Sequence, residues 1–70
     1  MEIISIESEY ITLAQFLKLT NYVSSGGQAK FFLMENDVII NGKLDRRRGL
    51  KLYDDDVILL ADSEYKITCI

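Results

Sequence analysis

The chain has 70 residues, of which 49% are apolar, so it predicts one small domain with its own core and excludes a disordered tail. With one cysteine and no histidine it cannot form an internal disulfide, and neither a zinc site nor an enzyme is expected. Its apolar runs fall far short of the ~20 residues of a membrane span. Its acidic N-terminus is unlike a secretion signal, which predicts a cytoplasmic protein with no membrane partner.

The formal net charge of −3 conceals a strong asymmetry along the chain. Residues 18–51 hold seven of the eight cationic side chains against three carboxylates, a net charge of +4. The remaining residues hold one lysine against eight carboxylates, a net charge of −7. Clustered cations set the local potential whatever the total charge is, so the middle of the chain predicts a binding site for a polyanion.

The first predicted elements are a strand and a helix. Residues 2–8 are short and β-branched, which indicates a strand. A helix is predicted over residues 12–21, because Thr12 and Gln15 fit a capping box and apolar side chains follow at helical spacing. Asn21 is predicted to end this helix, since asparagine tolerates the left-handed conformation.

A second helix is predicted to begin at Ser25, with Gln28 completing another capping box, and to end at Asn36. Two features of its first turns are unfavourable for a helix. Two consecutive glycines each cost up to ~1 kcal/mol, and Lys30 lies where the helix dipole disfavours a cation. A bound anion would explain both, because glycines let a phosphate approach the free N–H groups. Close packing of the two helices explains the glycines equally well.

Basic residues and a tight turn follow the second helix. Val38–Ile40 is predicted to be a strand, and Asn41-Gly42 a two-residue turn that requires positive φ at both positions. The run Arg46–Arg48 is interpreted either as a solvated loop or, with Lys51, as part of the polyanion site. In an extended segment its alternate side chains point in opposite directions.

The last third of the chain is predicted to form strands joined by turns. The run Asp54–Asp56 indicates a turn rather than a metal site, because adjacent carboxylates diverge and no second ligand-rich stretch exists. Residues 57–61 are continuously apolar, which predicts a strand buried on both faces. Residues 65–70 alternate, and Cys69 is interpreted as a small apolar side chain rather than a nucleophile.

Three motifs occur in a fixed order: SGG-x-AK at residues 25–30, V-x-x-NG at 38–42 and RRG-x-KL at 47–52. Together they resemble the S-four domain, the αL RNA-binding motif, and are most similar to its free-standing bacterial YaaA-type members. The resemblance covers residues 11–58 of a single domain, 1–70. It implies an α+β fold in which two packed helices lie on a small, mostly antiparallel β-sheet.

The same resemblance implies a non-catalytic protein that binds structured ribosomal or transfer RNA, as a monomer, in ribosome assembly or translation. Ribosome-associated proteins are further expected partners, and no cofactor or metal is expected. The resemblance and the charge distribution select the same candidate contacts: Lys18, Ser25, Gly26, Gly27, Gln28, Lys30, Asn41, Lys43, Arg46, Arg47, Arg48 and Lys51. The alternative function is a small protein–protein adaptor on a larger nucleic-acid machine, indicated by the negative net charge.

Phe31 lies opposite the apolar face of the second predicted helix on a helical wheel, so the sheet is not expected to cover it. It either stacks on a base or ribose of single-stranded RNA, or packs against the N-terminal strand or a protein partner. We favour packing.

Overall fold

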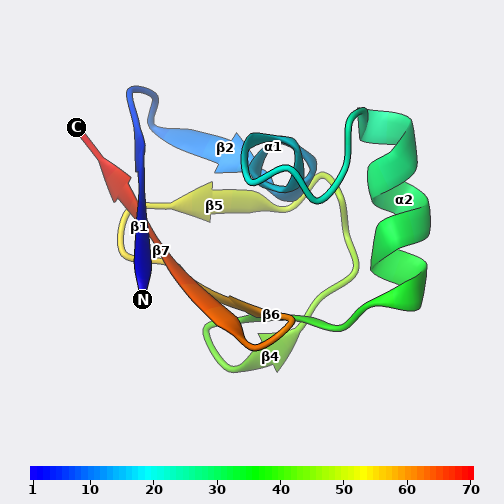
Figure 1. Ribbon diagram of the computed structural model, residues 1–70. Coiled ribbons are helices and arrows are strands. Elements are labelled where there is room, and N and C mark those ends of the chain that lie inside the picture. The colour runs from blue at the N-terminus through cyan, green and yellow to red at the C-terminus, as the bar shows by residue number, and fades with distance from the viewer.

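The computed structural model describes all 70 residues and has the predicted α+β architecture, with two helices and seven strands (Figure 1). In chain order the elements are β1 (Glu2–Ile6), β2 (Tyr10–Thr12), α1 (Leu13–Leu19), α2 (Gly26–Glu35), β3 (Val38–Ile40), β4 (Lys43–Leu44), β5 (Lys51–Tyr53), β6 (Val57–Leu60) and β7 (Ser63–Cys69). Neither helix is long and apolar enough to cross a membrane.

The main sheet has five strands in the order β1-β7-β6-β3-β4. Its neighbouring strands are antiparallel except for β1 and β7, which run parallel with Ile4 opposite Ile67. A parallel pair needs a long crossover connection, and here almost the entire chain provides it. The first and last strands are therefore neighbours (Figure 1). The mostly antiparallel sheet is confirmed.

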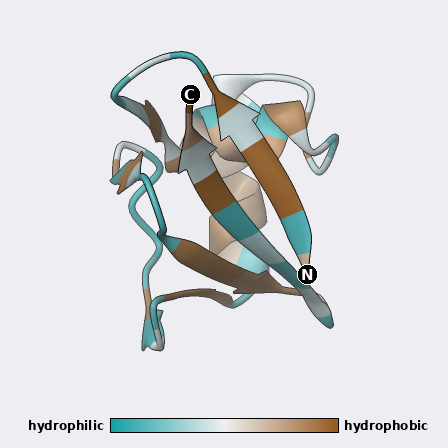
Figure 2. Cartoon of the chain, turned by 90° about the vertical axis from the view of Figure 1, so that its left-hand side faces the viewer, coloured by the Kyte–Doolittle hydropathy of each residue, from teal (hydrophilic) through white to brown (hydrophobic).

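The core lies between one face of this sheet and the layer formed by α1, α2 and β5. All 15 buried residues are apolar or aromatic, and no charged side chain is buried. Helix α1 contributes Leu13, Phe16 and Leu17, and α2 contributes Ala29 and Leu33, at the helical spacing seen in the sequence. Figure 2 shows apolar colour on strands and helices and mostly hydrophilic colour on the connecting loops.

Helix α1 begins as predicted. The Thr12 N–H donates to Gln15 Oε1 (2.8 Å) and the Gln15 N–H donates to Thr12 Oγ1 (3.2 Å), which completes the capping box. The helix ends at Leu19 rather than at residue 21, and its last turn is closed by backbone bonds from the Asn21 N–H to the Lys18 carbonyl (3.1 Å) and from the Tyr22 N–H to the Leu17 carbonyl (2.9 Å). Asn21 then takes the left-handed conformation expected of it, with φ of 67°.

Helix α2 is capped by Ser25 and stops before Asn36, also as predicted. The Gln28 N–H donates to Ser25 Oγ at 3.3 Å. The Gln28 side chain, however, does not return to Ser25 as a capping box requires. Its Oε1 accepts from both the N–H and the hydroxyl of Ser24, each at 2.7 Å, so it holds the connection between the helices instead.

Two strands were missed, and two predictions about other strands were wrong. Strands β2 and β5 were not expected, because three-residue strands show no periodicity and pair only across a long loop, with Ile11 opposite Leu52. Strand β6 was expected to be buried on both faces, but Leu59 is 45% exposed. The helices cover only one face of the main sheet, so the other face meets solvent. Strand β1 also stops at Ile6, short of the predicted residue 8.

Candidate nucleic-acid interface

The residues Arg46–Arg48, here called the arginine segment, run alongside α2. Arg46 Nη1 donates to the Leu33 carbonyl (2.6 Å), near the C-terminal end of the helix. Arg48 Nη1 reaches the Gly26 carbonyl (3.4 Å), in the first helical turn. The arginine segment therefore runs antiparallel to α2, from the C-terminal end of the helix to its N-terminal end.

The arginine segment also closes the start of α1. The Leu13 N–H donates to the Leu50 carbonyl (2.8 Å), and the Ala14 N–H donates to the Arg48 carbonyl (2.9 Å). The first N–H groups of a helix lack partners within the helix, and in α1 the neighbouring loop supplies them. These bonds fix Arg48 close to the starts of both helices.

The start of α2 is open. The N–H groups of Gly26 and Gly27 have no acceptor in the protein. A Cβ at Gly26 would meet nothing within 4 Å, and one at Gly27 only Ser25 Oγ at 3.9 Å. Neither glycine has positive φ. The packing explanation for these glycines is therefore wrong, because no contact or backbone conformation within the protein requires them.

Cations flank this open helix start on two sides. Lys18, at the end of α1, lines a shallow depression of about 490 Å³ together with Ser24 and Gln28. Arg48 lies at the Gly26 carbonyl, and Lys30 is exposed on the following turn of α2. None of Lys18, Lys30 or Arg48 forms an ion pair with a carboxylate. Their charge is free for an external anion.

The other two arginines are engaged within the protein. Arg46 Nη2 pairs with Asp37 Oδ1 at 2.9 Å, which places a cation at the C-terminal end of α2, where the helix dipole favours it. Arg47 Nη2 pairs with Asp45 Oδ2 at 2.7 Å, and its Nε lies 3.1 Å from Asp45 Oδ1. Hydrogen bonds from Arg47 hold the pKa of Asp45 below its ordinary value.

The remaining predicted contacts lie on other elements. Lys51 is on β5, opposite Thr12 at the start of α1, with its ammonium 4.8 Å from the centre of the Tyr10 ring. Lys43 lies on the short edge strand β4. The structure brings together one group at the start of α2: Lys18, Ser25, Gly26, Gly27, Gln28, Lys30 and Arg48. It does not bring Asn41, Lys43 or Arg46 to that place.

Asn41 has a structural role in the turn between β3 and β4. Asn41 and Gly42 both have positive φ, 50° and 86°, as the predicted turn requires. The Asn41 amide donates to Asp56 Oδ1 (2.9 Å) and accepts from the Val57 N–H (2.9 Å). Its side chain thus ties this turn to the beginning of β6.

The acidic run forms a turn, as predicted, and its three carboxylates diverge. Asp54 Oδ1 accepts from the Cys69 N–H (2.8 Å), and Asp56 Oδ2 accepts from the Tyr53 N–H (2.7 Å). Asp55, with φ of 70°, pairs with Lys66 at 3.4 Å. These contacts hold β5, β6 and β7 together.

Comparison with known proteins places the fold in a family. The profile of the S4 domain family matches residues 4–68. The chain belongs to the S4 domain family. It is also 56% identical over 55 residues to the probable ribosome maturation protein RlbA of Bacillus subtilis (strain 168), an alignment that covers 79% of this chain and 78% of that protein. The resemblance seen in the motifs is confirmed.

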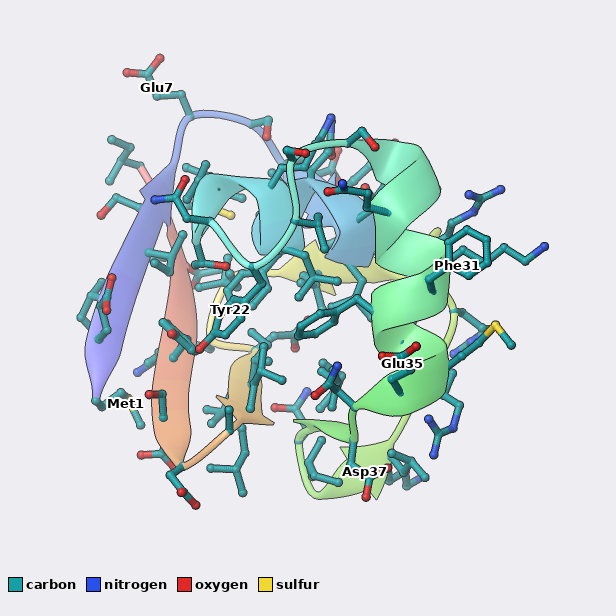
Figure 3. All side chains as sticks on the ribbon, turned by 45° about the vertical axis from the view of Figure 1, so that its right-hand side comes forward. Met1, Glu7, Tyr22, Phe31, Glu35 and Asp37 are labelled. Carbon is teal, nitrogen blue, oxygen red and sulfur yellow. The ribbon has the colours of Figure 1, made fainter.

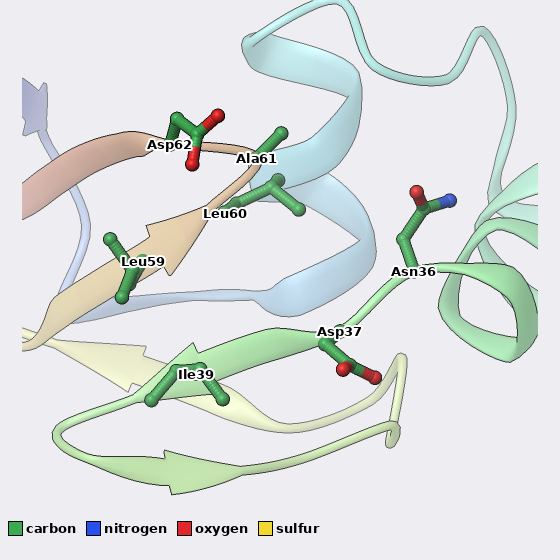
Figure 4. Close-up of a pocket in the computed structure, with 7 residues that line it drawn as sticks. All are labelled: Asn36, Asp37, Ile39, Leu59, Leu60, Ala61 and Asp62. Carbon is green, nitrogen blue, oxygen red and sulfur yellow. The ribbon is translucent and has the colours of Figure 1, made fainter.

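This S4 domain has a second surface feature, which the sequence did not indicate. On the solvent face of the main sheet, Ile39 lies between Leu44 on β4 and Leu59 on β6, and both leucines are about half exposed. Beside them is a depression of about 340 Å³ (Figure 4). Its lining residues are Asn36, Asp37, Ile39, Leu59, Leu60, Ala61 and Asp62. It was missed because Leu59 was predicted to be buried.

Proposed function

We propose that this S4 domain is a non-catalytic, cytoplasmic RNA-binding protein that recognises structured RNA by backbone charge and shape. One observation carries the proposal: the open start of α2. Two N–H groups without acceptors lie there beneath a surface clear of side chains, with Lys18, Lys30 and Arg48 around it. The name of the Bacillus relative supports a role in ribosome maturation, and we infer ribosomal or transfer RNA as the target.

A phosphate at the start of α2 would be stabilised in two ways. Helix N-termini favour anions through their free N–H groups and their dipole. Nearby cations add a second contribution, because phosphate contacts release counterions from the nucleic acid. Base-specific contacts inside a duplex are not expected, since A-form RNA hides its major groove. The RNA backbone is therefore the main recognised feature.

The other candidate contacts have different parts in this proposal. Lys51, opposite Thr12, extends the RNA footprint from α2 towards the start of α1, and Arg47 adds positive charge beside it although it is paired with Asp45. Arg46 and Asn41 serve the fold, because their side chains are already bonded to neighbouring elements. Lys43, on the sheet edge, adds only long-range attraction.

Fluorescence anisotropy with a labelled ribosomal RNA hairpin tests the proposal. The triple variant Lys18→Ala, Lys30→Ala, Arg48→Ala should lose more than about tenfold in affinity, since several phosphate contacts are removed. Lys43→Ala, Lys66→Ala is the matched control, because both lysines lie on the main sheet, and it should bind almost like the wild type. Equal binding by the triple variant and the control would contradict the proposal.

The exposed apolar row on the main sheet supports a second candidate function, a protein adaptor on a ribosomal particle. Co-sedimentation with ribosomal subunits separates the two candidates. If RNA contact holds the protein on the particle, Arg48→Ala should release it and Leu59→Ser should not. The reverse result would favour the adaptor.

A further inference from the structure

Phe31 is an exposed aromatic residue in the middle of α2. Its side chain is 63% exposed, and it takes part in none of the aromatic pairs of the protein. In Figure 3 it points away from the body of the molecule, on the side of α2 opposite the sheet. Packing against the N-terminal strand is therefore wrong, because β1 lies on the far side of the core, beside β7.

The surroundings of Phe31 connect it to the open start of α2. Side chains of a helix tend to lean towards its N-terminus, and Phe31 lies one turn after Gly27 on α2. Apart from the chain neighbours and the backbone of the helix, only Ser25 Oγ lies within 4 Å of a Cβ placed at Gly27, and the Phe31 ring does not fill this space. The ring therefore borders an unfilled surface, and that surface ends at the free N–H groups.

The charges beside Phe31 indicate which kind of partner fits. Arg48 reaches the Gly26 carbonyl, Lys18 lies beside Gln28, and the exposed Lys30 directly precedes Phe31 on α2. On α2 itself the nearest carboxylate, Glu35, is one turn further towards the C-terminal end. An apolar ring set among unpaired cations matches a nucleic acid, whose bases are flat and apolar and whose backbone is anionic.

We propose that Phe31 stacks on an unpaired base adjacent to the phosphate held at the start of α2. The RNA target is then a duplex with an unpaired nucleotide, such as a bulge or a loop edge, because a base must leave its helix to stack on protein. This inference rests on the proposed function. Stacking of this kind changes affinity by about 5- to 150-fold per base.

The test uses two synthetic hairpin RNAs, one with a perfect stem and one with a single bulged adenosine. Binding is measured for the wild type, Phe31→Leu and Phe31→Trp. Met34→Ala is the matched control, because Met34 is 66% exposed one turn along the same helix face and is not aromatic. The protein has no tryptophan, so Phe31→Trp also supplies a single tryptophan at the proposed contact, whose fluorescence is measured separately from that of the four tyrosines.

Phe31→Leu should weaken binding of the bulged hairpin by about 5- to 150-fold while binding of the perfect hairpin, and the salt dependence of both, change little. The bulged RNA should quench the fluorescence of Phe31→Trp, and Met34→Ala should keep the preference for the bulge. Unchanged affinity of Phe31→Leu together with unquenched fluorescence of Phe31→Trp would overturn this inference but not the proposed RNA binding. A protein-docking role for Phe31 predicts the same result. An equal loss for both hairpins would overturn it too. Failure of the wild type to bind either hairpin at low salt would overturn the proposed function with it.

Discussion

At the scale of single residues, the two glycines of α2 lower the stability of the helix but leave its start accessible to a ligand. A glycine in a helix is less stable than alanine because its backbone loses more conformational freedom on folding. Gly26 and Gly27 have room for a methyl group and an ordinary φ. Because the fold does not require glycine at either position, an external ligand that approaches the helix start explains why both side chains are absent.

Replacing these glycines should therefore stabilise the protein and weaken RNA binding. Gly26→Ala and Gly27→Ala should each raise the free energy of unfolding by about 0.5–1 kcal/mol, measured by urea denaturation. The added methyl group should lower RNA affinity by roughly tenfold, because it keeps the phosphate from the free N–H groups. Gly49→Ala, at an equally open position outside the helix, is the control and should leave affinity unchanged. A stabilised variant with full affinity would show that the helix start is not the phosphate site.

Substitution of two residues of the arginine segment should affect RNA binding in one case and stability in the other. Arg48→Ala should flatten the log–log dependence of affinity on salt by about one unit, since one phosphate contact is lost. Arg46→Ala should leave that slope unchanged and lower the free energy of unfolding by about 1 kcal/mol, because the C-terminal end of α2 loses its cation. Salt titrations and urea denaturation of both variants check this. Equal slopes for the two variants would refute the division of roles.

At the scale of elements, the connection between the helices is fastened to the sheet by a pair of tyrosines. The hydroxyls of Tyr22 and Tyr65 lie 2.8 Å apart, and the Tyr65 ring also packs edge-on against Phe16 at 5.3 Å. The hydrogen bond to Tyr22 raises the pKa of Tyr65 above its ordinary value. This contact keeps the depression beside Lys18 in place, because Tyr22 lines it.

The Tyr65 hydroxyl should make stability depend on pH in the alkaline range. Because its pKa is higher in the folded protein than in the unfolded chain, its stabilising contribution is complete below a pH of about 10. It is lost as the pH rises through the folded-state pKa. The melting temperature of Tyr65→Phe should therefore fall less steeply above pH ~10 than that of the wild type. Tyr53→Phe, which alters an exposed ring, should follow the wild type. Parallel curves for all three proteins would argue against this role.

Both helices could be predicted because their signals are local. The cap of α1 joins residues three apart in sequence, and Ser25 caps α2 in the same way. Strands β2 and β5 could not be predicted, because they exist only through pairing between residues some forty positions apart, such as Ile11 with Leu52. The exposure of Leu59 could not be predicted either, because it depends on which face of the sheet the helices cover.

The candidate site could be predicted only in part, because a charge count does not show which cations already have partners. The pairing of Arg46 with Asp37 is nonlocal and had no visible signal. The pairing of Arg47 with Asp45 joins residues only two positions apart, so a local signal for it was present in the sequence. The role of Arg48 at the starts of both helices became visible only when loop and helices were folded together.

At the scale of the whole molecule, three unpaired cations, Lys18, Lys30 and Arg48, lie around the start of α2, while most carboxylates lie on the strands and turns. A protein of net charge −3 should then still bind RNA in a strongly salt-dependent way. Neutralising about three phosphates gives a log–log slope of about −3, a loss of roughly 50-fold between about 50 and 200 mM salt. Anisotropy titrations over this range measure the slope. A slope near zero would mean that charge does not drive binding.

Strand β7 lies between β1 and β6, so the last strand in chain order joins the first strand to the rest of the sheet. Until it arrives, β1 has no neighbour at all, and the apolar side chains of Ile4 and Ile6 have no strand to lie beside. The five-stranded sheet therefore cannot be complete before β7 is present. Completion of the sheet thus requires that translation has passed through β7, which ends at Cys69.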